Sequence, residues 1–191
     1  LEDFEGGALT TPGIMAISGS VNPPSPTTDS VDADDGAVDG QGADGHSYAD
    51  DAMGGTLDLT FTFDEQALGA LPSHVGVVWT DGDANVSLEA FDADGVSLGI
   101  VGPAMLGDGS DDGATAEDRF LGISHPAGIA AFTIRNMGDG LEFDHLQYGY
   151  APAYSHDAHA IDPDDDTLRY SLGDRPPGIR VGRVTGPAAW Q

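Results

Sequence analysis

Short runs of alternating apolar and polar residues recur through the first 150 residues, which is the pattern of half-buried antiparallel strands. The clearest case is residues 56–63, where four apolar residues spaced two apart, from Leu57 to Phe63, would share one face. Three more alternating runs lie within residues 75–101, and the Asp- and Gly-rich segments TDGDAN and DADG separate them. Because such segments favour tight turns, these runs predict a three-stranded meander.

Other apolar runs predict the remaining strands. We expect an entry strand within residues 1–21 with Phe4 facing inward, two strands in 120–137 broken at HPAG, and a strand over 141–150. The run 129–134 has apolar residues at both odd and even positions, which predicts a strand buried on both faces. The segment DEQALGALPS predicts a connection with one helical turn. With 28 glycines and 12 prolines, turns are favoured over long helices. We expect an all-β fold, in which eight or nine strands form an antiparallel jelly-roll-like β-sandwich.

The charge balance limits the classes of binding partner that this chain can have. Asp and Glu number 33 against six arginines and no lysine, which gives a net charge of −27. Such a chain repels nucleic acids and anionic membranes, and no apolar run is long enough for membrane insertion. Two interpretations stay open together, a salt-adapted acidic surface and Ca²⁺ binding by clustered carboxylates. The absence of cysteine excludes disulfides, thiolate catalysis and cysteine-ligated zinc.

Carboxylates are densest in residues 29–51, where eight aspartates are interspersed with glycines. Ca²⁺ takes six to eight oxygen ligands, so this segment is the first candidate for a calcium site. A second candidate lies near the C-terminal end, where three aspartates alternate along the chain. The first group is Asp32, Asp34, Asp35 and Asp39, and the second is Asp162, Asp164 and Asp166.

The chain changes character near Pro152, so we expect one domain over 1–150 and another over 151–191. In the second, DPDDDTLRYSL, PPGI and VTGPAAW resemble the first part of a cadherin-like, immunoglobulin-type repeat of bacterial surface proteins. Asp165 departs from that pattern, which has Gly there, as do residues 187–189. The match stops at Trp190, before the closing strands of such a repeat. The resemblance implies a partial immunoglobulin-like β domain with an open sheet edge.

Residues 29–149 resemble, more loosely, N-terminal jelly-roll modules of secreted bacterial proteins. The phrases that carry this are DSVDADDGAVDGQGADGHSY, LGALPSHVGVVWTDG, EAFDADGVSLG and LEFDHLQYG. Those modules are similar to carbohydrate-binding sandwiches, whose structural Ca²⁺ joins the entry strand to the last strand. The resemblance implies a site formed by Asp3 or Glu5 with Asp144.

Other chemistry has weaker support in the sequence. The six histidines show no HExxH spacing, so we interpret them as surface or internally satisfied residues. Only Glu142 and Asp144, beside Phe143, sit where a carboxyl pKa would rise as in a glycosidase, and no nucleophile or nucleotide motif occurs. We therefore expect no enzyme. Trp79, Tyr148 and Tyr150 could stack on sugars, although core positions are the commoner role of such residues.

Together these features predict a non-catalytic, extracellular or cell-surface module stabilised by calcium, with a structural or adhesive role. The open edge of the partial repeat suggests self-association into a fibre by strand exchange. Its alternative is that the chain is a piece of a longer protein that holds the missing strands. The alternative from another functional class is a carbohydrate-binding module of a secreted multidomain protein, with a glycan as partner.

Overall fold

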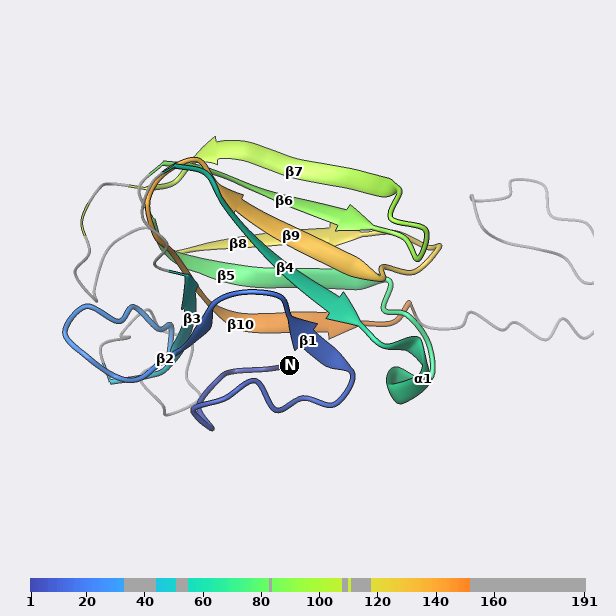
Figure 1. Cartoon of the computed structure of the whole chain (residues 1–191), viewed down its shortest axis with the longest axis horizontal. Helices are drawn as coiled ribbons and strands as arrows, with labels where there is room; N and C mark the ends of the chain where they lie inside the picture. Colours follow the sequence, from blue (N-terminus) through green and yellow to red (C-terminus); the bar gives the residue numbers. More distant parts are fainter. Residues whose placement is uncertain (33–43, 51–54, 83, 108–109, 111–117, 152–191) are drawn as a thin grey trace, which may run out of the picture. The chain divides into compact units, whose positions relative to one another are not determined.

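The computed structural model describes residues 1–32, 44–50, 55–82, 84–107, 110 and 118–151 (Figure 1). The chain divides into two units, residues 1–151 and 152–191. The second unit lies outside the described residues, so the partial cadherin-like repeat stays a prediction. Among the described residues, no helix is long and apolar enough to cross a membrane.

The described part of the first unit contains ten strands and one short helix. In chain order they are β1 (Ile14–Ala16), β2 (Ser20–Asn22), β3 (Ser47–Asp50), β4 (Leu57–Phe63), α1 (Glu65–Leu68), β5 (His74–Gly82), β6 (Asn85–Phe91), β7 (Ser97–Met105), β8 (Arg119–Ser124), β9 (Ala131–Asn136) and β10 (Leu141–Gly149). They form two five-stranded antiparallel sheets, with the orders β1-β4-β9-β6-β7 and β2-β3-β10-β5-β8.

The strand pairs are nested along the sequence. The hairpin β6–β7 lies innermost, and around it β5 pairs with β8, β4 with β9, and β3 with β10. Eight strands paired in this way and divided between two sheets make a jelly roll. Strands β1 and β2 extend the two sheets beside β4 and β3. The predicted all-β, jelly-roll-like sandwich is confirmed.

Two local predictions are wrong. The three strands of residues 75–101 are present, but β5 and β6 lie in opposite sheets, so only β6 and β7 form a hairpin. Alternation identifies the buried face of a strand without identifying its sheet. Strand β9 is also not fully buried on both faces, since Phe132 and Ile134 face the core while Ala131 and Thr133 on the other face are only partly buried. Arg135, next on this strand, is exposed and forms an ion pair with Asp58 of β4.

The core lies between the sheets and is rich in aromatic rings. Phe61 and Phe132, on adjacent strands, stack with ring centroids 5.2 Å apart, and Phe143 meets the ring of Phe61 edge-on from the other sheet. Trp79 on β5 is fully buried. Such rings contribute large buried areas together with specific contact geometry. The last strand, β10, therefore has one face fixed firmly against the core.

Candidate metal centre

Two neighbouring residues of β10 point away from the core on the same side. Successive strand residues normally face opposite sides of a sheet. In β10 the pairing with β5 shifts between Asp144 and Gln147, and His145 adopts a left-handed backbone conformation with φ of 49°. This β-bulge leaves His145 on the side of Asp144 and returns Leu146 to the core. In a regular strand, alternation would instead place His145 on the side of Phe143 and Leu146 on the side of Asp144.

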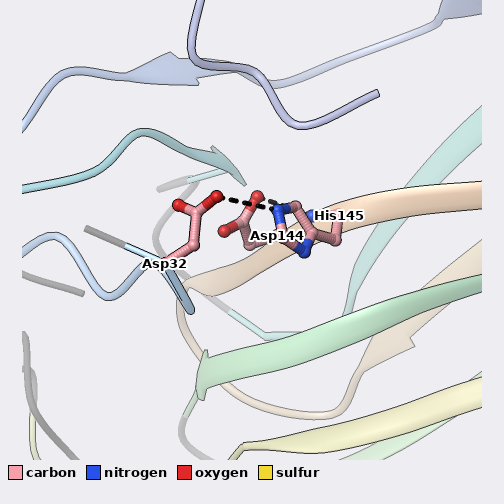
Figure 2. Close-up of side chains that lie close together, drawn as sticks. All are labelled: Asp32, Asp144 and His145. Carbon is pink, nitrogen blue, oxygen red and sulfur yellow. Dashed lines mark hydrogen bonds and ion pairs between the residues drawn. The ribbon is translucent and has the colours of Figure 1, made fainter. Parts of the chain in front are cut away.

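Asp32 reaches this pair from a segment far away in the sequence. Its Oδ2 lies 3.2 Å from Nε2 of His145, and Figure 2 shows the three side chains converging from the segment before residue 33 and from β10. One ligand atom of each of Asp32, Asp144 and His145 lies within 4.8 Å of the others. All three residues are buried, with exposed fractions of 2%, 0% and 4%. We call these residues the 32/144/145 cluster.

Hydrogen bonds hold the carboxylates of the cluster in place. The hydroxyl of Ser30 lies 3.2 Å from Oδ1 of Asp32 and 3.0 Å from Oδ2 of Asp144, and it donates to either oxygen. The backbone N–H of Val31 donates to the same Asp144 oxygen at 3.0 Å. Partners of this kind around ligating groups orient them and tune their basicity. The segment that carries Asp32 is thus fixed to β10 through polar contacts.

Glu142, two residues earlier on β10, holds the start of the same segment. Its carboxylate accepts hydrogen bonds from the backbone N–H of Asp29 at 3.2 Å and from the hydroxyl of Ser47 on β3. Burial raises the pKa of Glu142 to about 7, and the nearby charges of Asp81 and Asp29 add to this rise. Residues 29–32 therefore lie against β10, where the carboxylates of Glu142 and Asp144 accept their hydrogen bonds.

Burial also raises the pKa of Asp144, although hydrogen bonds and the proximity of His145 act in the opposite direction. A carboxyl group in such surroundings favours either a proton or a bound cation over a bare negative charge. The cluster combines two carboxylates with one imidazole, and both group types are ligands of divalent metal ions. Its chemistry is therefore that of a cation site.

The structure brings only part of the predicted calcium residues together. Asp32 and Asp144 meet, but they come from two sites that we predicted separately. Asp3 is exposed and accepts a hydrogen bond from the N–H of Glu5, whose own carboxylate binds the backbone and ring of His46. The other predicted ligands lie outside the described residues: Asp34, Asp35, Asp39, Asp162, Asp164 and Asp166.

The buried carboxylate of the entry segment is Glu2, which the sequence analysis did not select. It accepts hydrogen bonds from the N–H groups of Phe4, Thr10 and Thr11 and from the hydroxyl of Thr11. The backbone of Glu2 also pairs with Leu146 next to the bulge. The entry segment thus pairs with the last strand, as the resemblance implies. The carboxylate of Glu2, however, accepts hydrogen bonds from N–H and O–H groups of the protein and does not join the carboxylate of Asp144.

The structure also shows where the residues considered for catalysis and for sugar stacking lie. The pKa values of Glu142 and Asp144 are raised, as predicted, but by burial on the face opposite Phe143. The two residues are 6% and 0% exposed, so a glycoside does not reach them in this structure. Trp79 is buried, which removes it as a sugar-stacking residue, and Tyr148 is partly buried and packs against the core. Tyr150 and Phe120 are exposed.

Comparison with known proteins adds similarities of fold. Neither any protein-family model nor any curated protein sequence matches this chain. Among solved structures, TmCBM61 in complex with β-1,4-galactotriose is 14% identical, with a TM-score of 0.41 over 76% of this chain and 94% of that one. The enzymatically active domain of tailspike protein 4 from bacteriophage CBA120 is 10% identical, with a TM-score of 0.38 over 77% of this chain and 20% of that one.

Proposed function

We propose that residues 1–151 form a non-catalytic, extracellular structural or adhesive module that a divalent cation stabilises at the 32/144/145 cluster. The observation that carries this proposal is the convergence of Asp32, Asp144 and His145, all buried, from segments 113 residues apart. A cation there would tie the segment 28–32 to the last strand of the jelly roll. Calcium, the cation expected from the sequence, is one candidate.

Thermal unfolding in EDTA and with added divalent cations, at constant ionic strength, tests this proposal. An ion that binds only the folded state at 100 times its Kd stabilises it by about 2.7 kcal/mol. At about 2–4 °C per kcal/mol for a domain of this size, the midpoint should rise by roughly 5–10 °C. Asp32→Asn should remove this rise, whereas the same change at exposed Asp3 should leave it intact.

NaCl separates the cation site from a salt-adapted surface. Screening by monovalent salt relieves repulsion among all the carboxylates without needing a defined site. If NaCl in EDTA reproduces the full shift, or if no divalent cation raises the midpoint, the proposal is wrong. We further propose self-association into a fibre through residues 152–191, and the molar mass of the chain by light scattering over a range of concentrations tests it.

A second candidate function, glycan binding, has one specific observation in its favour. Phe120 on β8 is 59% exposed, and its ring lies against Gly76 and Gly122, which pair across β5 and β8. The exposed residue Gln147 pairs with Gly76 on the other side. A flat apolar ring beside a polar side chain is a surface on which a neutral sugar could stack and form hydrogen bonds. Glycan-array binding that Phe120→Ala abolishes and Tyr150→Ala preserves would support this function.

A further inference from the structure

The donor set of the 32/144/145 cluster distinguishes among divalent cations. Ca²⁺ is a hard ion that takes six to eight oxygen ligands. The imidazole of His145 offers nitrogen, a donor that suits zinc, copper, iron and nickel. With the carboxylates of Asp32 and Asp144, the cluster provides three protein ligands. Zinc commonly takes this number when one coordination position is left for water.

The backbone of β10 places His145 in this set at a cost. A left-handed backbone conformation at a non-glycine residue is sparsely populated, so the surrounding structure has to hold it in place. A regular strand would instead direct the imidazole of His145 to the core face. Bulges re-aim side chains, and this one aims the imidazole at Asp32. The bulge thus makes the imidazole nitrogen of His145 part of the cluster.

We infer that the 32/144/145 cluster prefers a divalent transition-metal ion of the zinc class over Ca²⁺, with Nε2 of His145 as the ligand that gives this preference. The inference rests on the proposed function, whose cation it narrows. Ser30 is a positioning residue in this site, because its hydroxyl lies between the two carboxylates.

Calorimetric titration of the EDTA-stripped full chain, with Zn²⁺ and Ca²⁺ in separate experiments at the same ionic strength, tests the inference. We expect one Zn²⁺ per chain to bind at least 100-fold more tightly than Ca²⁺. His145→Gln should weaken Zn²⁺ binding at least tenfold and leave Ca²⁺ binding within twofold. The matched control is His74→Gln, which changes an exposed histidine on β5 and should alter neither affinity.

Cobalt gives a spectroscopic readout of the same ligand. Co²⁺ in place of Zn²⁺ should show visible ligand-field absorption that His145→Gln changes and His74→Gln preserves. The comparison of Zn²⁺ with Ca²⁺ on the unaltered chain needs no variant, so a folding defect in His145→Gln would not leave the inference untested.

The outcomes separate this inference from the proposed function. If Ca²⁺ binds more tightly than Zn²⁺ and raises the unfolding midpoint, the metal preference is overturned and the cation-stabilised module stands. Zn²⁺ affinity that is unchanged in His145→Gln also overturns the preference. If neither ion raises the midpoint, both fail.

Discussion

Nε2 of His145 lies 3.2 Å from Oδ2 of Asp32, although 113 residues separate the two in the sequence. The contact joins the segment before residue 33 to the bulge of the last strand. Its neighbours on the same strand, Glu142 and Asp144, hold the same segment through backbone amides and Ser30. The stability of this region therefore depends on buried polar groups.

Removing the hydroxyl of Ser30 should weaken cation binding without removing a ligand. Outer-shell partners of metal ligands typically contribute 10–100-fold to affinity, so we expect Ser30→Ala to lower the affinity by about this factor. Calorimetric titration with the cation that raises the unfolding midpoint most is the measurement. Ser87→Ala, on the outer face of β6, is the control and should bind normally. Equal affinities in the two variants would show that Ser30 does not position the ligands.

In EDTA, the free energy of unfolding should fall as the pH rises from about 4.5 to about 7. The folded-state pKa of Glu142 is raised from 4.5 to about 7, so folding favours its protonated form. Its stabilising contribution is complete below the unfolded pKa and is lost as the pH passes the folded one. At 1.36 kcal/mol per pKa unit, the change is on the order of 3 kcal/mol.

Urea unfolding at several pH values measures this dependence, and Glu142→Gln isolates it. The variant has no titrating group at that position, so its profile should be flatter by this amount between pH 4.5 and 7. Relief of general charge repulsion on acidification would act on both proteins alike. Equal slopes in the two would therefore contradict the prediction.

Glu2→Gln should destabilise the fold by about 2–3 kcal/mol. The carboxylate of Glu2 is 5% exposed and accepts four hydrogen bonds from Phe4, Thr10 and Thr11. Hydrogen bonds to a charged acceptor contribute more than neutral ones, and an amide nitrogen turned toward these donors would be left unpaired. Urea unfolding of the variant measures the loss. Asp3→Asn, at the exposed neighbour, should stay within about 0.5 kcal/mol of the unaltered chain, and an equal loss in both would refute the role of Glu2.

Gly82→Ala should cost about 1–3 kcal/mol through overpacking. A Cβ at residue 82 would lie 2.2 Å from Cζ2 of Trp79, a ring with no exposed surface. Gly149→Ala, also on a strand of this sheet, is the control, because a Cβ there meets no atom within 4 Å. Thermal unfolding of both variants tests the prediction, and similar midpoints would contradict it.

The sequence was enough to predict much of the fold. Strand β4 follows its alternation from Leu57 to Phe63, and the helical turn after it lies in the predicted connection. The division of β5 and β6 between two sheets was missed because alternation is the same in either sheet. Only long-range pairing, such as β5 with β8, decides it.

The cluster could be predicted only in pieces. Asp32 was selected for its acidic surroundings and Asp144 from a resemblance, but local pattern does not show that residues 113 apart meet. The histidines show no metal-binding spacing in the sequence, and regular alternation would place His145 opposite Asp144. The bulge that brings the two together leaves no mark in the apolar pattern. Glu2 is absent from the predicted ligands because the resemblance implies only Asp3 or Glu5 from the entry segment.

The nested pairing of the strands has a kinetic consequence. Asp32 precedes β3 in the chain, while Asp144 and His145 lie on β10, so the inner pairs β4–β9 and β5–β8 lie between them in the sequence and we expect these pairs to close first. Because the entropy of loop closure is lost before a contact between distant residues can stabilise the chain, we expect this contact to form late in folding. An interaction absent from the transition state slows unfolding and leaves the folding rate nearly unchanged. A cation bound at the 32/144/145 cluster would thus lengthen the lifetime of the folded sandwich by slowing its unfolding, and it would leave the rate of folding nearly unchanged.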